Sequence, residues 1–161
     1  MDTLNDNDAR YLRRAIELST LASRAGSRPF GAVVVAADGR VLAEAHNDNA
    51  ATGDCTAHAE VNALRIASPK HGRDVLAGAT MYASGEPCVM CAGAIFWSNI
   101  RRVVFGIDAV SLRTFRATQA GAGDVQMSCR DVFAAAPHAI ETLGPALLDE
   151  AAAPHRAFWN L

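Results

Sequence analysis

The sequence lacks an excess of positive charge. Lysine and arginine together number 15 and aspartate and glutamate 17, so the formal net charge is −2. A protein that binds the phosphate backbone of a nucleic acid usually carries a basic patch or a basic balance. The neutral balance therefore disfavours a nucleic-acid partner, although a local basic patch can exist within a neutral total.

Long apolar runs are also missing. No hydrophobic stretch approaches the ~20 residues that a membrane-spanning helix needs, and the N-terminal segment is polar and acidic, unlike a secretory signal. We therefore expect a cytoplasmic protein with no membrane partner. The chain has 161 residues, of which 50% are hydrophobic and 20% charged, and this predicts one globular domain spanning residues 1–161.

Cysteines are few, and their spacing is informative. They are Cys55, Cys88, Cys91 and Cys129. In a reducing compartment, a close cysteine pair is more often metal-binding or catalytic than disulfide-bonded. Cys88 and Cys91 can bind one metal ion together, because residues three apart share a helix face. Pro87 favours a helix start there, and the positive end of a helix stabilises thiolates.

Alternating helical and strand patterns predict an α/β fold. Apolar spacing predicts helices over residues 8–25, 57–67, 88–98 and from Pro145 to about residue 159. Strand-like runs occupy residues 30–37, 40–46, 79–84, 101–107 and 138–144. Residues 38–39 predict a hairpin turn and residues 47–55 a loop, while residues 108–126 favour neither pattern. This order indicates a mixed sheet between helices.

A histidine and a glutamate occupy the start of the second predicted helix. His58 and the two thiolates make three zinc ligands, and the sequence offers no second cysteine or histidine pair to close the site. A structural zinc site has a fourth protein ligand, whereas a catalytic site leaves that position to water and lowers the pKa of the water. Glu60 is not needed as a ligand, so it can move protons between that water and a substrate.

The two halves of this pattern form a known signature. H-x-E at residues 58–60 followed by P-C-x-x-C at residues 87–91 is typical of zinc nucleobase deaminases. The blocks RPFGAVVV, TAHAEVNALRIA and SGEPCVMCAGAIFWSNIRRVVFG resemble the purine-acting and cytosine-acting bacterial branch of the cytidine-deaminase-like superfamily. The resemblance covers about residues 15–106. It implies a three-layer α-β-α sandwich with a central mixed five-stranded sheet, one Zn²⁺ per chain and a homodimer or a larger oligomer.

The resemblance also implies a reaction and its residues. Zinc hydroxide would attack the ring carbon that bears an amino group, and catalytic Glu60 would pass protons to the ring nitrogen and the departing ammonia. Asn47 matches an asparagine that holds the base in relatives, and Phe30 an aromatic residue near the base. A turn role for Asn47 and a core role for Phe30 are the alternatives. The backbone amide of Ala59 matches a contact to the substrate carbonyl.

Other positions have roles that the sequence leaves open. Glu86 matches the glutamate of the family's EPC motif, for which we expect a structural role or one in supporting the zinc ligands. Cys55 stands where the family commonly has a proline, which indicates a small packed residue. The sequence assigns no role to Cys129, and it places Trp97 either at the pocket or at a dimer interface.

The expected substrate is a nucleobase or nucleoside, and guanine is the first candidate. GSRPFGAVVV and MYASGEPCVMC resemble guanine and guanosine deaminases, and the C-terminal PHRAFWNL, with Phe158 and Trp159, resembles their aromatic segment over the site. However, guanine deaminases usually carry acidic base contacts after the fourth strand, and AVSLRTFRATQAG after Asp108 shows no acidic match.

Three alternatives stay open. tRNA adenosine deaminases share EPCVMCAGAI, but residues 101–161 hold six basic and six acidic residues, which disfavours RNA. Other small amino-heterocycles, such as cytosine, isoguanine, a pterin or an s-triazine, fit the same motifs. A zinc protein that has the fold without catalysis is the third alternative, and the presence of Glu60 argues against it.

Overall fold

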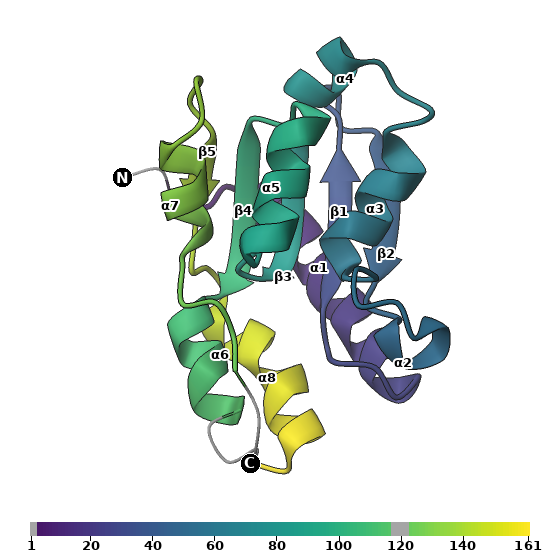
Figure 1. Ribbon diagram of the computed structural model, residues 1–161, viewed down its shortest axis with the longest axis vertical. Coiled ribbons are helices and arrows are strands. Elements are labelled where there is room, and N and C mark those ends of the chain that lie inside the picture. The colour runs from purple at the N-terminus through teal and green to yellow at the C-terminus, as the bar shows by residue number, and fades with distance from the viewer. Residues whose placement is uncertain (1–2, 117–122) are drawn as a thin grey trace.

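The computed structural model describes residues 3–116 and 123–161 and places a five-stranded sheet between two layers of helices (Figure 1). The strands are β1 (Gly31–Val35), β2 (Val41–His46), β3 (Thr80–Gly85), β4 (Arg102–Ile107) and β5 (Glu141–Leu143), in the order β2-β1-β3-β4-β5. β1 runs antiparallel to β2 and β3, whereas β4 is parallel to β3 and β5. The predicted mixed five-stranded α/β sandwich is confirmed.

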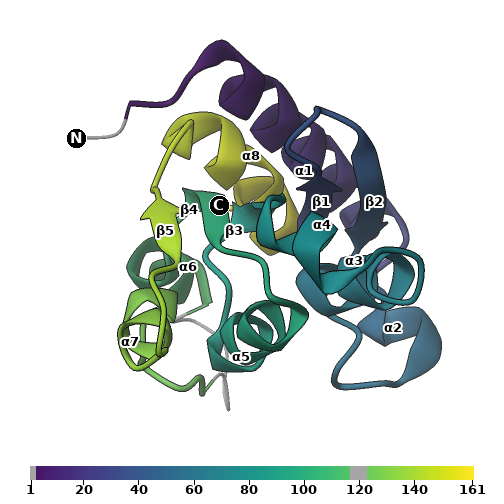
Figure 2. The same cartoon turned by 90° about the horizontal axis from the view of Figure 1, so that it is seen from above.

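One face of the sheet is covered by α3 (Ala59–Ala67), α5 (Val89–Ser98) and α7 (Cys129–Ala134) (Figure 2). Ala63 of α3, Ile95 of α5 and Phe133 of α7 are buried in one apolar cluster with Val34 and Phe105 of the sheet. Helical spacing puts the apolar side chains of α3 and α5 on the sheet side. The starts of these two helices are thereby held at fixed positions over the sheet.

The opposite face carries α1 (Asp6–Arg24) and α8 (Leu148–Trp159), and α6 (Ala109–Arg116) lies beside α8 (Figure 1). Leu12 of α1 and Ala151 of α8 pack with Val33 and Val104. Neighbouring strand residues alternate between the two clusters, as the pleat of a buried strand requires. Within residues 3–116 and 123–161, none of the helices has the length and apolar character needed to cross a membrane.

The structure corrects some of the predicted element boundaries. The final helix begins at Leu148 rather than at Pro145, because the amide of Ala146 bonds the carbonyls of Phe105 and Gly106 at the end of β4. The predicted loop at residues 47–55 contains the short helix α2 (Asn49–Thr52), and α4 (Arg73–Ala77) lies in a stretch for which no helix was predicted. The undecided stretch 108–126 contains α6.

A buried carboxylate ties the start of α1 to the sheet. Asp8 is 1% exposed and accepts hydrogen bonds from the hydroxyl of Tyr82 at 2.8 Å and from two guanidinium nitrogens of Arg102 at 2.7 and 3.0 Å. Asp8 also completes a capping box with Asn5 at the start of α1. One side chain therefore joins α1 to both β3 and β4.

Candidate functional site

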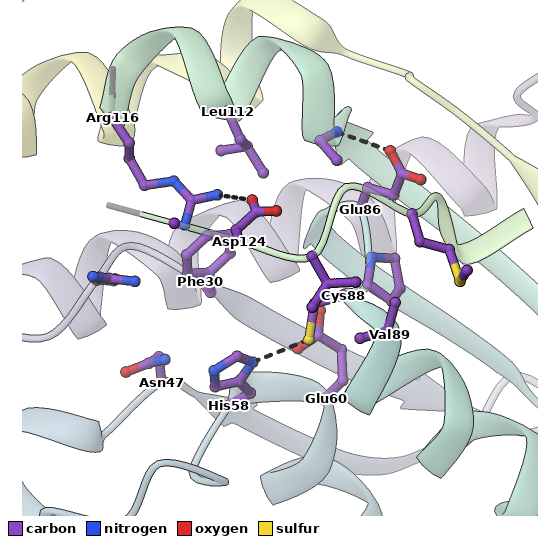
Figure 3. A pocket seen from close by; sticks show the side chains of 16 residues that line it. Phe30, Asn47, His58, Glu60, Glu86, Cys88, Val89, Leu112, Arg116 and Asp124 are labelled. Carbon is purple, nitrogen blue, oxygen red and sulfur yellow. Dashed lines mark hydrogen bonds and ion pairs between the residues drawn. The ribbon is translucent and has the colours of Figure 1, made fainter. Parts of the chain in front are cut away.

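Three side chains that can bind a metal meet where α3 and α5 begin, and two of them, His58 and Cys88, are drawn in Figure 3. His58 is the N-cap residue of α3, Cys88 is that of α5, and Cys91 follows in the first turn of α5. The Nδ1 atom of His58 lies 3.6 Å from Sγ of Cys88 and 3.5 Å from Sγ of Cys91. The two distant sequence motifs thus meet in space.

These distances fit a tetrahedral zinc ion. Zn–S bonds of about 2.3 Å and Zn–N bonds of about 2.0 Å at tetrahedral angles separate sulfur from nitrogen by about 3.5 Å. Among the described residues, this is the only group of three or more potential ligands whose binding atoms lie within 4.8 Å of one another. Two thiolates and one imidazole therefore fit a zinc site that leaves one position for water.

The pKa values of the two cysteine thiols are shifted in opposite directions. A hydrogen bond from Cys91 outweighs burial and, together with His58, lowers the pKa of Cys88 to about 4. The hydrogen bond to Cys88 and the burial of the side chain both raise the pKa of Cys91. One thiolate is therefore favoured before metal binding, at the positive end of α5.

Glu60 lies buried beside the three ligand residues, in the first turn of α3. It is 4% exposed, and its Oε2 atom is 3.4 Å from Sγ of Cys91. Burial raises the pKa of Glu60 to about 7, and the nearby negative charge of Cys88 adds to this effect. A carboxyl group that titrates near neutral pH can both accept and donate a proton.

A cavity of about 290 Å³ opens in front of these residues. Figure 3 shows His58, Glu60 and Cys88 on one side of it and Leu112, Arg116 and Asp124 on the opposite side. The first set comes from the chain up to α5 and the second from the chain after β4. We refer to the second side, formed by the lining residues of α6 and of residues 123–127, as the C-terminal wall.

Two of the three predicted substrate contacts line this cavity. Phe30 lines it, and its ring packs against His155 in a T-shaped pair with 5.0 Å between ring centres. Asn47 also lines it, although its side chain is partly engaged by Asn49, through bonds of 2.7 and 3.1 Å. Ala59 is fully buried and is absent from the described lining residues.

The C-terminal wall contains residues that the sequence did not indicate. Asp124 lines the cavity and accepts a hydrogen bond of 2.7 Å from Arg116. Asp108, the acidic residue noted directly after β4, instead binds the amide and hydroxyl of Ser111 inside α6. An acidic side chain after the fourth strand therefore does reach the cavity, but from a part of the chain that carries no local motif.

The C-terminal aromatic residues lie near the same site. Phe158 and Trp159 line a second, more open cavity of about 580 Å³. This cavity shares Arg28, Asn47 and His58 with the first. The expectation that the C-terminal segment approaches the site agrees with this placement.

The remaining cysteines and Trp97 lie outside the ligand group. Cys55 is exposed and lines the second cavity, so the prediction of a packed residue at this position is wrong. Cys129, the first residue of α7, is buried in the core. Trp97 is 76% exposed, and it is not among the described residues that line the first cavity.

Known proteins resemble this chain over the same features. The family model described as the cytidine and deoxycytidylate deaminase zinc-binding region matches residues 5–107. A protein of Schizosaccharomyces pombe named a probable cytosine deaminase is 41% identical over 157 residues, which cover 98% of this chain and 95% of that protein. The guanine deaminase of Bacillus subtilis is also 41% identical, over 63% of this chain and 65% of its own length.

A solved structure shares the fold as well. It comes from studies of A-to-I editing by tRNA:A34 deaminases at the wobble position of transfer RNA. It superposes with a TM-score of 0.72 at 31% identity, over 91% of this chain and 99% of the other. The similarity of fold thus extends over most of the chain.

Proposed function

This chain belongs to the cytidine and deoxycytidylate deaminase family, and we propose that its substrate is a free nucleobase. It is a zinc-dependent enzyme that deaminates a nucleobase or nucleoside by hydrolysis. The observation that carries the proposal is the cavity of about 290 Å³ beside His58 and Glu60. That volume lies at the lower end of the range for small-molecule pockets, and it suits one planar base.

We assign the zinc ligands to His58, Cys88 and Cys91 and the proton transfers to Glu60. Zinc bound there lowers the pKa of a water ligand enough to provide a nucleophile near neutral pH. Glu60 accepts a proton from the attacking water and donates it to the ring nitrogen beside the attacked carbon. Glu60 then carries the second proton of the water to the amino group, which leaves as ammonia while the carbon keeps the oxygen as a carbonyl.

The cavity offers both apolar and polar contacts to a planar ring. Phe30 and Leu112 supply apolar surface, and Asn47 and Asp124 supply polar atoms. Asn47 retains a second amide hydrogen and further lone pairs beyond its bonds to Asn49. The contact of the Ala59 amide with a substrate carbonyl stays a prediction, as do the homodimer and the cytoplasmic location.

We place cytosine first and guanine second among the candidate bases. One relative that aligns with nearly the whole chain, and so with the C-terminal wall, is named a probable cytosine deaminase. Guanine, which the sequence motifs favour, gains support from Asp124, because a carboxylate in the wall can accept ring N–H groups. Both bases carry an exocyclic amino group on a ring carbon, and hydrolysis releases this group as ammonia.

Ammonia release tests this proposal directly. The zinc-loaded protein is incubated with cytosine, guanine, adenine, isoguanine, their nucleosides and an anticodon stem–loop. We expect turnover of cytosine or guanine, and Glu60→Ala should lower it by roughly a thousandfold while zinc content stays at one per chain. Turnover confined to the stem–loop would contradict the free-base proposal, and loss of zinc from Glu60→Ala would contradict the role assigned to Glu60.

A further inference from the structure

Glu86 makes contacts that extend across the site. Its Oε2 atom accepts the backbone amide of Ala109 at 2.8 Å, the first residue of α6. Its Oε1 atom accepts the hydroxyl of Ser128 at 2.5 Å and the amide of Cys129 at 3.1 Å, where α7 begins. One carboxylate thus bonds to the starts of two helices, where amides lack partners within the helix and the dipole favours negative charge.

The position of Glu86 in the chain makes these contacts significant. It lies two residues before Cys88, and its own amide donates to the carbonyl of Ile107 at the end of β4. Its backbone is therefore part of the segment that carries a zinc ligand, while its side chain holds the segments on the opposite side of the cavity. Figure 3 shows Glu86 between Cys88 and the start of α6.

The helix starts that Glu86 holds are continuous with the C-terminal wall. α6 presents Leu112 and Arg116 to the cavity, and residues 123–127, which include Asp124, lead directly to Ser128 and α7. A shift of either helix start would move this wall relative to the zinc ligands. The distance across the cavity therefore depends on the Glu86 carboxylate.

We propose that Glu86 is a positioning residue that fixes the C-terminal wall at a set distance from the zinc ligands and thereby determines which base fits. The inference rests on the proposed function, because it concerns selection of the base in the same cavity. Glu86 itself performs no proton transfer in this assignment. Its effect is to hold Leu112, Arg116 and Asp124 at a fixed distance from the reacting carbon.

The acceptor pattern of Glu86 agrees with this role. Its two carboxylate oxygens accept three hydrogen bonds, from the hydroxyl of Ser128 and from the amides of Ala109 and Cys129, and a carboxylate offers acceptors alone. A glutamine at this position keeps one acceptor oxygen and turns an NH₂ group toward a donor.

The test compares Glu86→Gln with Asp131→Ala. Asp131 also caps α7, through the amide of Ser128 at 3.0 Å, but among the described residues its side chain has no hydrogen bond or ion pair with the segment that carries Cys88. For Glu86→Gln we expect an unchanged zinc content, a KM for the preferred base raised roughly tenfold and a kcat within about threefold of the parent value. The preference between cytosine and guanine should fall, and amide exchange at Ala109 and Cys129 should accelerate. Asp131→Ala should leave KM and the preference unchanged, because Glu86 still holds the start of α7 through Ser128 and Cys129 in that variant.

A second variant distinguishes the loss of these hydrogen bonds from general misfolding. Ser128→Ala removes the hydroxyl that donates one of the three hydrogen bonds to Glu86. Its effect on KM should not add to that of Glu86→Gln in the double variant. The proposal is overturned if amide exchange accelerates while KM and the preference stay unchanged, or if zinc is lost in parallel with activity. If only the stem–loop is turned over, the free-base proposal fails, and the KM for the stem–loop then decides the role of Glu86.

Discussion

At the scale of single residues, His155 shows how packing behind the cavity controls charge. Its imidazole is 1% exposed and lies between the rings of Phe30 and Phe115, with ring centres 5.0 and 6.3 Å away. Burial, with a smaller effect from the charge of Arg116, lowers its pKa to about 4. Neutral His155 therefore supports Phe30, which lines the cavity.

This pKa predicts a dependence of stability on pH. An unfolded histidine titrates near 6.5, so between pH 6.5 and 4 the unfolded chain binds a proton that folded His155 does not. The contribution of His155 is full above pH 6.5 and decreases as the pH falls. From pH 7 to 5, the parent protein should lose about 2 kcal/mol more unfolding free energy than His155→Leu.

Urea unfolding of both proteins at several pH values measures this difference. Loss of zinc in acid affects the parent and the variant alike, so it cancels in the comparison. Parallel curves for the two proteins would contradict the assignment of a depressed pKa to His155.

At the scale of elements, the hydrogen bonds of Asp8 to Tyr82 and Arg102 join α1 to the sheet. Burial would raise the pKa of Asp8, but hydrogen bonds from Arg102 and Tyr82 outweigh it and lower the pKa. Asp8→Asn should reduce the unfolding free energy at pH 7 by about 2 to 3 kcal/mol, because it removes a charged acceptor from a buried site. The difference should narrow as the pH falls below about 4, because the carboxyl group of the unfolded chain binds a proton there while folded Asp8, whose pKa is lowered, does so only at a lower pH.

A matched variant shows whether the burial of Asp8, rather than its charge alone, determines the loss of stability. Glu141 also bonds Arg102, at 3.1 Å, but its side chain is 46% exposed. Glu141→Gln should therefore cost less than about 1 kcal/mol. Equal losses from Asp8→Asn and Glu141→Gln in chemical unfolding at pH 7 would contradict the specific role of Asp8.

The elements that were predicted from the sequence have local signals. The hairpin of β1 and β2 follows from apolar runs around Asp38-Gly39, and α1, α3 and α5 follow from helical spacing. α2 and α4 have four and five residues, which is too short for a helical period to be visible. α7 does carry a capping box of Ser128 and Asp131 that the sequence analysis did not use.

The site likewise contains residues that local motifs predict and residues that they do not. His58, Glu60, Cys88 and Cys91 belong to motifs whose chemistry can be read from spacing, and the structure brings them together. Asp124 and Leu112 reach the cavity only because the chain after β4 returns across it, held by Glu86. That return depends on contacts between residues far apart in the sequence, so no local pattern predicts it.

At the scale of the whole molecule, the three ligand residues connect α3 to α5. A metal that binds the folded state alone stabilises it in proportion to the logarithm of its concentration. Chelation of zinc should therefore lower the melting temperature by roughly 10 °C, and added zinc should restore it. Differential scanning calorimetry measures the shift.

Two variants make this experiment specific. His58→Ala should respond little to the chelator, because one ligand is already missing. Cys55→Ser should respond like the parent, since Cys55 is exposed and lies outside the ligand group. A full chelator response in His58→Ala, or its loss in Cys55→Ser, would show that the metal binds elsewhere.

The division of the cavity between two parts of the chain has an evolutionary consequence. The residues assigned to hydrolysis lie between positions 58 and 91, and the C-terminal wall is built from residues of α6 and of positions 123 to 127. After a gene duplication, mutations in the later segment can change which amine is accepted while the copy continues to hydrolyse. The fold thus allows new specificities to arise without an intermediate that has lost its chemistry.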